Sequence, residues 1–268
     1  MYHSTMFCRV NRSEDDVLNA ECTWLANDHE MTAWLVTGVR DLRIRKAGWA
    51  AYRSPGKAVG VFELPELVGC EAYLFSGPDL KRVFGRPGLE AQRELVSECI
   101  RGIVQAETFF FTERGFASAL DYDAFWDKMY VNGCTYYSHL DQIEKPWMEF
   151  AGNPERQLNL FNRVKTATVR PGEMMTEVSA VFMDSFHELG VRIELDRNGA
   201  IAGITGDYVS APDKICWRNL DHLPRFAGVR LMDLGKKEIA GIAGGAHGCH
   251  HLVDLIHEAA RAVKAAGV

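Results

Sequence analysis

The richest group of side chains that could do chemistry lies at residues 247–251, which read His-Gly-Cys-His-His. Apolar residues follow with helical spacing from Leu252 onward, so the pattern places Cys249 at the start of a helix. The positive end of a helix dipole stabilises a thiolate, which is the form of cysteine that binds a metal or attacks an electrophile. The sequence therefore predicts a metal-binding or reactive thiol at this helix start.

Residues far from Cys249 in the sequence could join it at a metal ion. His187 stands at the start of a predicted strand, and Cys216 lies between the returning strand and the next helix. Thiolate and imidazole ligands together suit zinc, iron or an iron–sulfur unit. The alternative is that both cysteines are small core residues. The predicted ligands of a zinc or iron ion are His187, Cys216, Cys249 and His250.

A second group, in the first half of the chain, could transfer protons. His29 is followed by Glu30, and imidazole titrates near neutral pH, where it acts as a general acid or base beside carboxylate and phenol groups. The alternative for His29 is a local hydrogen bond without catalysis. Arg101 and Glu107 are two further candidates on a helix predicted from Leu89. They stand six residues apart and so do not share a helix face closely. The predicted catalytic residues are His29, Glu30, Tyr52, Arg53, Arg101 and Glu107.

The stretches that carry these two groups resemble each other. His29-Glu30-Met31 and His187-Glu188-Leu189 each precede an alternating segment and then a proline, Pro55 or Pro212, at nearly the same spacing. Residues 64–69 (Leu-Pro-Glu-Leu-Val-Gly) match residues 223–228 (Leu-Pro-Arg-Phe-Ala-Gly), and glycines precede an apolar-periodic helix in both halves. The ordered set of matches indicates an internal duplication.

Local patterns predict the elements of each copy. Residues 191–196 alternate apolar and polar with period two, residues 196–199 (Asp-Arg-Asn-Gly) supply a hairpin turn, and residues 200–208 form the returning strand. Residues 249–266 have helical spacing. We predict an α+β fold of two diverged copies, each a small antiparallel sheet with helices on one face, at residues 1–106 and 166–268.

Residues 107–165 have no counterpart in the second copy and are rich in aromatic side chains. We predict a helical insert, in which residues 108–114 end the long helix and residues 122–132 form another, with Asp121 as its N-cap. The aromatic residues either pack between the two copies or line a ligand pocket. The predicted substrate-binding residues are Trp126, Tyr130, Tyr136, Tyr137 and His139.

Composition excludes several classes of protein. A net charge of −6 and a pI near 5.9 disfavour nucleic-acid binding, which needs a basic face. No stretch reaches the roughly 18 apolar residues of a membrane span, and the N-terminus lacks the pattern of a secretory signal. The seven cysteines are widely spaced, without Cys-x-x-Cys, which is typical of reduced thiols. The glycine motifs of nucleotide sites are missing. We expect a cytoplasmic protein without an organic cofactor, bound to neither nucleic acid nor membrane.

The segment from His187 to the C-terminus resembles a bacterial family of unknown function. The pattern of that family is His-Asp-Met, a strand hairpin, a proline followed by cysteine, and a final Gly-Cys-Thr-His-Leu. Here the matching runs are residues 187–189, Pro212 with Cys216, and residues 248–252, with His250 in place of the threonine and Leu189 in place of the methionine.

The same segment is distantly similar to the NifU-type scaffold for iron–sulfur clusters. That resemblance implies that His187, Cys216 and Cys249 converge on one metal. The first cysteine of the scaffold falls near Ser185 here, so the resemblance implies a zinc-like site rather than a complete cluster-building site.

Three functions follow from these observations. We favour a catabolic enzyme of the lyase or hydratase type, acting by proton transfer on an apolar or aromatic small molecule, because an aromatic-walled cavity stabilises rings. The alternatives are a metal or iron–sulfur carrier built on the second copy, and a non-catalytic small-molecule binding protein. The protein could also form a homodimer, because the two copies could pack within one chain or exchange between chains.

Overall fold

The chain forms two compact units in the computed structural model, which describes residues 1–54, 59–152 and 156–268. The N-terminal unit comprises Met6–Tyr122 and Gly152–Arg163. The C-terminal unit comprises Met1–Thr5, Asp123–Ala151 and Val164–Val268. The segment predicted as an insert is therefore divided, with residues 107–122 in the first unit and 123–151 in the second.

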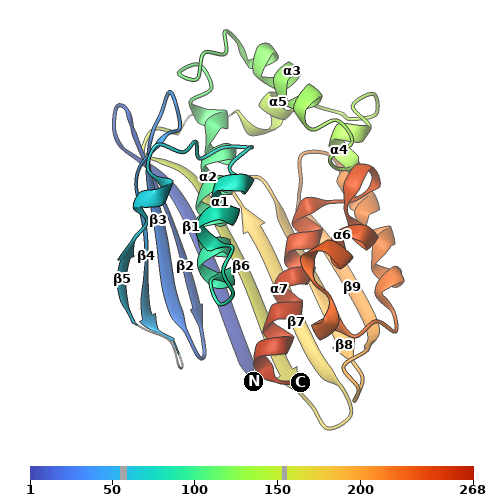
Figure 1. The fold of residues 1–268 in the computed structure, drawn as a ribbon. Coiled ribbons are helices and arrows are strands. Elements are labelled where there is room, and N and C mark those ends of the chain that lie inside the picture. Colours follow the sequence, from blue (N-terminus) through green and yellow to red (C-terminus); the bar gives the residue numbers. More distant parts are fainter. Residues whose placement is uncertain (55–58, 153–155) are drawn as a thin grey trace. The chain divides into compact units, whose positions relative to one another are not determined.

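Antiparallel strands and a long helix build the N-terminal unit (Figure 1). The helix α2 packs against β2 and β3, because both strands place every second side chain in the core. The strand order here is β5-β4-β3-β2-β1-β6. The strands are β1 (Tyr2–Glu14), β2 (Val17–Ala26), β3 (Glu30–Gly38), β4 (Ile44–Arg53) and β5 (Gly60–Glu63). The helices are η1 (Pro65–Leu67), α1 (Gly77–Phe84), α2 (Glu90–Ala106) and η2 (Glu107–Phe109).

The C-terminal unit has the same kind of build. Its strand order is β1-β6-β7-β8-β9, and the helix α7 packs against β7 and β8. The first residues of β1 and the last of β6 belong to this unit, with β6 (Asn159–Pro171), β7 (Thr176–Asp184), β8 (Glu188–Leu195) and β9 (Ile201–Ser210). The helices that follow the sheet are η3 (Lys214–Phe226), η4 (Leu231–Asp233), α6 (Lys236–Ala243), η5 (Gly245–His247) and α7 (His250–Ala266). Antiparallel strands combined with helices confirm the coarse α+β prediction.

The two hairpins aligned by the sequence repeat have irregularities at matching points. The pairing of β3 with β4 shifts between Glu30 and Met31 and again between Val36 and Thr37. The pairing of β8 with β9 shifts between residues 188 and 189 and again between residues 194 and 195. After each hairpin a glycine with positive φ donates a backbone hydrogen bond to the start of the returning strand, at 2.8 Å from Gly69 to Ile44 and from Gly228 to Ile201. Pro55, part of the predicted repeat, lies outside the described residues.

The segment between the units differs in detail from the prediction. The long helix α2 ends at Ala106, so residues 108–114 do not continue it. The next helices are α3 (Ala119–Met129), α4 (Thr135–Ser138) and α5 (Trp147–Ala151). Asp121 is not the N-cap of α3, because Ser118 precedes the helix and its Oγ accepts a hydrogen bond from the Asp121 amide at 3.1 Å. Among the described helices, none has the length and apolar character that crossing a membrane would require.

Candidate metal centre

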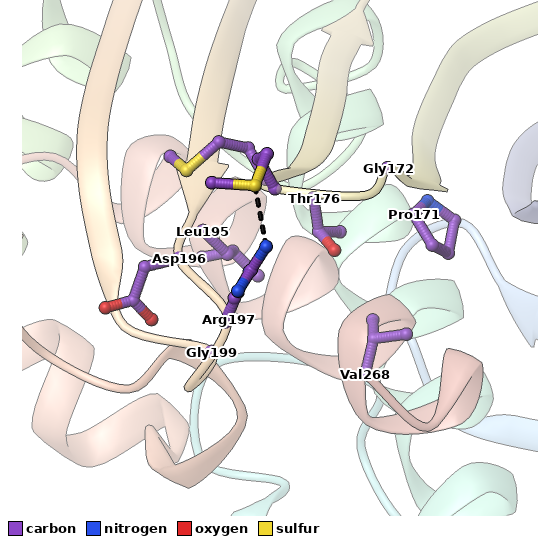
Figure 2. A pocket seen from close by; sticks show the side chains of 10 residues that line it. Pro171, Gly172, Thr176, Leu195, Asp196, Arg197, Gly199 and Val268 are labelled. Carbon is purple, nitrogen blue, oxygen red and sulfur yellow. Dashed lines mark hydrogen bonds between the residues drawn. The ribbon is translucent and has the colours of Figure 1, made fainter.

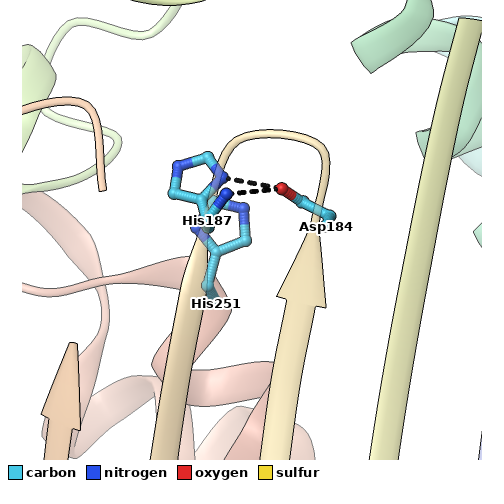
Figure 3. Close-up of side chains that lie close together, drawn as sticks. All are labelled: Asp184, His187 and His251. Atoms are coloured by element: carbon cyan, nitrogen blue, oxygen red, sulfur yellow. Dashed lines mark hydrogen bonds and ion pairs between the residues drawn. The ribbon is translucent and has the colours of Figure 1, made fainter. Parts of the chain in front are cut away.

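Three side chains meet where the hairpin β7–β8 turns beside the first turn of α7 (Figure 3). Asp184 ends β7, His187 precedes β8, and His251 is the second residue of α7. One potential ligand atom from each of the three lies within 4.8 Å of the others. The tight turn places Asp184 next to His187, and the packing of α7 on the same two strands brings His251 to them.

Asp184 orients His187 through a local network. The Oδ1 atom of Asp184 accepts hydrogen bonds from the amides of Phe186 (2.9 Å) and His187 (2.8 Å). The same Oδ1 lies 3.1 Å from Nδ1 of His187. A carboxylate oxygen accepts hydrogen bonds, so Nδ1 of His187 can donate to Asp184, and this contact orients the imidazole ring. The Asp184 side chain is fully shielded from solvent and that of His187 is 8% exposed, so this orientation is held in a dry environment.

His251 lies against His187 and beside a thiol. The centroids of the two imidazole rings are 3.9 Å apart, and the Phe182 ring lies 4.9 Å from that of His251. Nδ1 of His251 is 3.9 Å from Sγ of Cys249, which is the N-cap residue of α7. The prediction that Cys249 stands at a helix start is confirmed.

Burial controls the protonation of the thiols in this region. Loss of solvent raises the pKa of Cys249, and backbone amides at the helix start only partly offset it. This rise in the pKa of Cys249 opposes the thiolate form predicted for the helix start. Burial also raises the pKa of Cys216, and that of Cys134 to about 11.

The predicted ligands are placed as follows. His187 belongs to the cluster, and Cys249 lies next to it. Cys216 is buried close enough to Cys249 for their charges to interact. His250 points elsewhere, with its ring 6.2 Å from that of Tyr130. Asp184 and His251 are not among the ligands predicted from the sequence. The available signals were the spacing Asp-x-x-His around a strand end and the second of two adjacent histidines.

Aromatic rings surround the cluster within the same unit. Trp147 lies nearly parallel to His187, with 6.2 Å between ring centroids, and meets Phe186 edge-on at 4.8 Å. The predicted substrate-binding residues do gather: the ring of Tyr130 is 5.3 Å from that of Trp126 and 5.4 Å from that of Tyr137. The ring of Tyr136 lies 5.1 Å from that of Tyr137, and the ring of His139 lies 5.6 Å from that of His247. These rings make the surroundings of the start of α7 apolar.

The catalytic candidates of the N-terminal unit occupy different places. His29 and Glu30 stand at the end of the hairpin β3–β4, where Nδ1 of His29 lies 2.8 Å from Asp28. Arg53, the pairing partner of Glu30, donates to the carbonyl of Ala26, whereas the neighbouring Tyr52 is 61% exposed. Arg101 forms ion pairs with Glu94 and Glu98. Glu107 forms an ion pair with Arg114 and accepts a 2.6 Å hydrogen bond from the hydroxyl of Tyr73. Burial raises the pKa of Glu107.

A pocket lies at the other end of α7 (Figure 2). Its volume is about 280 Å³, and its lining includes Thr176, Asp196 and Val268. Arg197 spans it, with Nη2 2.7 Å from Sδ of Met174. Because α7 has 17 residues, its two ends are about 25 Å apart, so this pocket is separate from the histidine cluster.

One family model matches the chain. It is described as a protein of unknown function (DUF2889), and the match covers residues 164–264. The matched segment contains Asp184, His187 and His251, and it supports the expected resemblance to a family of unknown function. Neither the curated proteins nor the solved structures contain a match.

Proposed function

We propose that the protein is a metal-dependent enzyme for small molecules, of the lyase or hydratase type, whose zinc or ferrous ion is held by the cluster of Asp184, His187 and His251. The convergence of these three side chains within 4.8 Å carries the proposal. Two imidazoles and one carboxylate form a ligand set of catalytic zinc and of non-haem iron sites, in which further positions stay open. An ion held there would polarise a substrate oxygen or lower the pKa of a bound water.

The surroundings of the cluster favour an apolar or aromatic substrate. The indole of Trp147 and the ring of Phe186 lie beside His187, and the tyrosines of the aromatic group lie near the start of α7. Aromatic faces bind planar apolar molecules by burial and offset stacking. A water-poor setting also strengthens the electrostatic effect of a cation on a developing negative charge.

We also propose that the two units are diverged copies of one ancestral unit. Matching register shifts in the two hairpins, and matching glycine hydrogen bonds after them, support this proposal. Both units then continue to a 17-residue helix. On this alignment the N-terminal unit keeps His29 but has Ala26 and Ala91 where the C-terminal unit has Asp184 and His251. The duplication therefore favours chemistry in the C-terminal unit.

A metal carrier is the second candidate. The observation that favours it is a pair of buried thiols, Cys249 beside the cluster and Cys216 close enough to Cys249 for their charges to interact, because thiolates bind soft metals strongly. A carrier must release its ion to an acceptor, whereas an enzyme retains it through turnover.

Metal analysis of protein purified without a histidine tag tests the proposal. We expect about one zinc or iron ion per chain after reconstitution, and loss of at least nine tenths of it in His187→Ala and His251→Ala variants. His250→Ala is the matched control, because this neighbour points to Tyr130 instead, and it should retain the ion. Wild-type protein that stays metal-free after reconstitution contradicts the proposal. Rapid loss of the ion to a chelator at neutral pH would instead favour the carrier.

A further inference from the structure

The thiol of Cys249 lies next to one ring nitrogen of His251. Sγ and Nδ1 are 3.9 Å apart, which is within the range of a hydrogen bond to sulfur. The side chain of Cys249 is buried, so water does not compete for this contact. With Nδ1 directed at the thiol, the nitrogen of His251 that remains for a metal is Nε2.

The backbone holds Cys249 in this position. Its amide donates to the carbonyl of Ala243 at 2.8 Å, and the carbonyl of Gly248 accepts from the amide of Thr135 at 2.9 Å. A Cβ at Gly248 would lie 2.3 Å from the carbonyl oxygen of Ala243, so this close approach requires glycine. The loop before α7 is therefore fixed from both sides, and the thiol with it.

A second polar group, the hydroxyl of Tyr208, interacts electrostatically with the same thiol. The hydroxyl of Tyr208 is buried and makes no hydrogen bond that meets the usual distance limits within the described part of the chain. It lies close enough to Cys249 for each group to affect the pKa of the other. A buried hydroxyl without a partner is costly, and a cysteine sulfur can accept a hydrogen bond.

We infer that Cys249 is a positioning residue, whose sulfur accepts a hydrogen bond from Nδ1 of His251 and thereby presents Nε2 of that histidine to the metal. The inference rests on the proposed metal centre. Cys249 would act on His251 from outside the proposed ligand set of Asp184, His187 and His251. Such outer partners fix the tautomer and the ring orientation of metal-binding histidines.

Cobalt binding to a small set of variants tests this role. We expect Cys249→Ala to weaken Co²⁺ binding about 10- to 100-fold, and Cys249→Ser to restore most of the affinity, because a hydroxyl can also accept from Nδ1. Cys134→Ala is the control for loss of a neighbouring, half-buried thiol. An unchanged affinity in Cys249→Ala would overturn the inference. So would a sulfur-to-cobalt charge-transfer band that disappears in Cys249→Ser, because it would make Cys249 a direct ligand.

The tautomer of His251 can be measured without any metal. In ¹⁵N-labelled wild-type protein we expect the NMR pattern of an imidazole protonated at Nδ1, and a shift towards the other tautomer in Cys249→Ala. Wild-type protein that has this tautomer but binds no metal would contradict the proposed function and leave the positioning role supported. A His251 protonated at Nε2 in wild-type protein would overturn the positioning role, whatever the metal content.

Discussion

The ends of the two hairpins, in the N-terminal and C-terminal units, are built alike but hold different side chains. His29 and His187 stand at matching positions, and the backbone amide at residue 26 or 184 donates to the carbonyl of that histidine in each unit, at 2.9 Å and 2.7 Å. Three residues before the histidine, the N-terminal unit has Ala26, whereas the C-terminal unit has Asp184, whose carboxylate orients the histidine ring. His29 pairs instead with its neighbour Asp28.

A buried charge network, in contrast, is present in both units. Glu98 on α2 and Glu258 on α7 each pair with an arginine three residues later, Arg101 or Arg261. Each glutamate also pairs with a cation on β6, at 3.3 Å from Arg163 to Glu98 and at 3.3 Å from Lys165 to Glu258. Features that join helix to sheet are thus shared by both units, whereas among the described residues the cluster of potential metal ligands lies in the C-terminal unit. This difference separates residues that maintain the fold from residues that serve a site.

The largest effect is expected from breaking the shared network. Glu258→Gln removes the charge of a carboxylate that lies 3.3 Å from the ammonium of Lys165, which is 1% exposed. Glu98→Gln does the same at Arg163. Each change should lower the free energy of unfolding by roughly 3–5 kcal/mol, measured by urea denaturation at pH 7. Glu149→Gln breaks an exposed pair with Lys145 and should cost less than about 1 kcal/mol. Similar losses in all three variants would mean that burial does not decide the strength of these pairs.

A gain of function would sharpen the comparison further. Ala26→Asp combined with Ala91→His supplies the N-terminal unit with the two side chains that it lacks around His29. We expect the metal content to rise from about one to about two ions per chain, with the new site roughly 10- to 100-fold weaker because no outer partner orients its second histidine. Titration with Co²⁺ measures both sites, and Ala26→Asp alone is the control. A folded double variant that still binds one ion would show that the two hairpin ends are not equivalent.

The smallest effect is expected from the glycines before the two long helices. Gly88 has a φ of +88°, and an added Cβ there would meet nothing within 4 Å, so Gly88→Ala should cost about 1–2 kcal/mol of stability through backbone strain alone. Gly248→Ala forces the backbone away from Ala243, at a similar cost of about 1–3 kcal/mol, and displaces Cys249 as well. Only Gly248→Ala should therefore weaken Co²⁺ binding. Equal cobalt affinity in both variants would argue against the role of the loop before α7.

Much of the C-terminal unit could be predicted from local patterns. The alternation at residues 191–196 lies within β8, and the helical spacing from residue 249 matches α7, which spans His250–Ala266. These predictions succeed because side-chain periodicity depends only on the geometry of one strand or one helix. The N-cap of α3 was predicted three residues too late, because Ser118 and Asp121 have equally suitable side chains and only the backbone path separates them.

The candidate site itself depended on contacts that no local pattern contains. Successive helix residues point about 100° apart, so the packing of α7 decides that His251 faces His187 while His250 faces Tyr130. Asp184 can be recognised as part of the site only from the turn between β7 and β8, which places its carboxylate 3.1 Å from Nδ1 of His187.

The sequence by itself determined the hairpin that follows His187, the final helix and the position of Cys249 at the start of that helix, because these follow from periodicity and from the preferences of turn residues. Tertiary structure decided which histidines meet and in which direction the pKa of Cys249 shifts. Both outcomes depend on burial and on distances between segments remote in the chain: the same helix start that favours a thiolate in water is here enclosed, and the loss of solvent raises the pKa of that thiol.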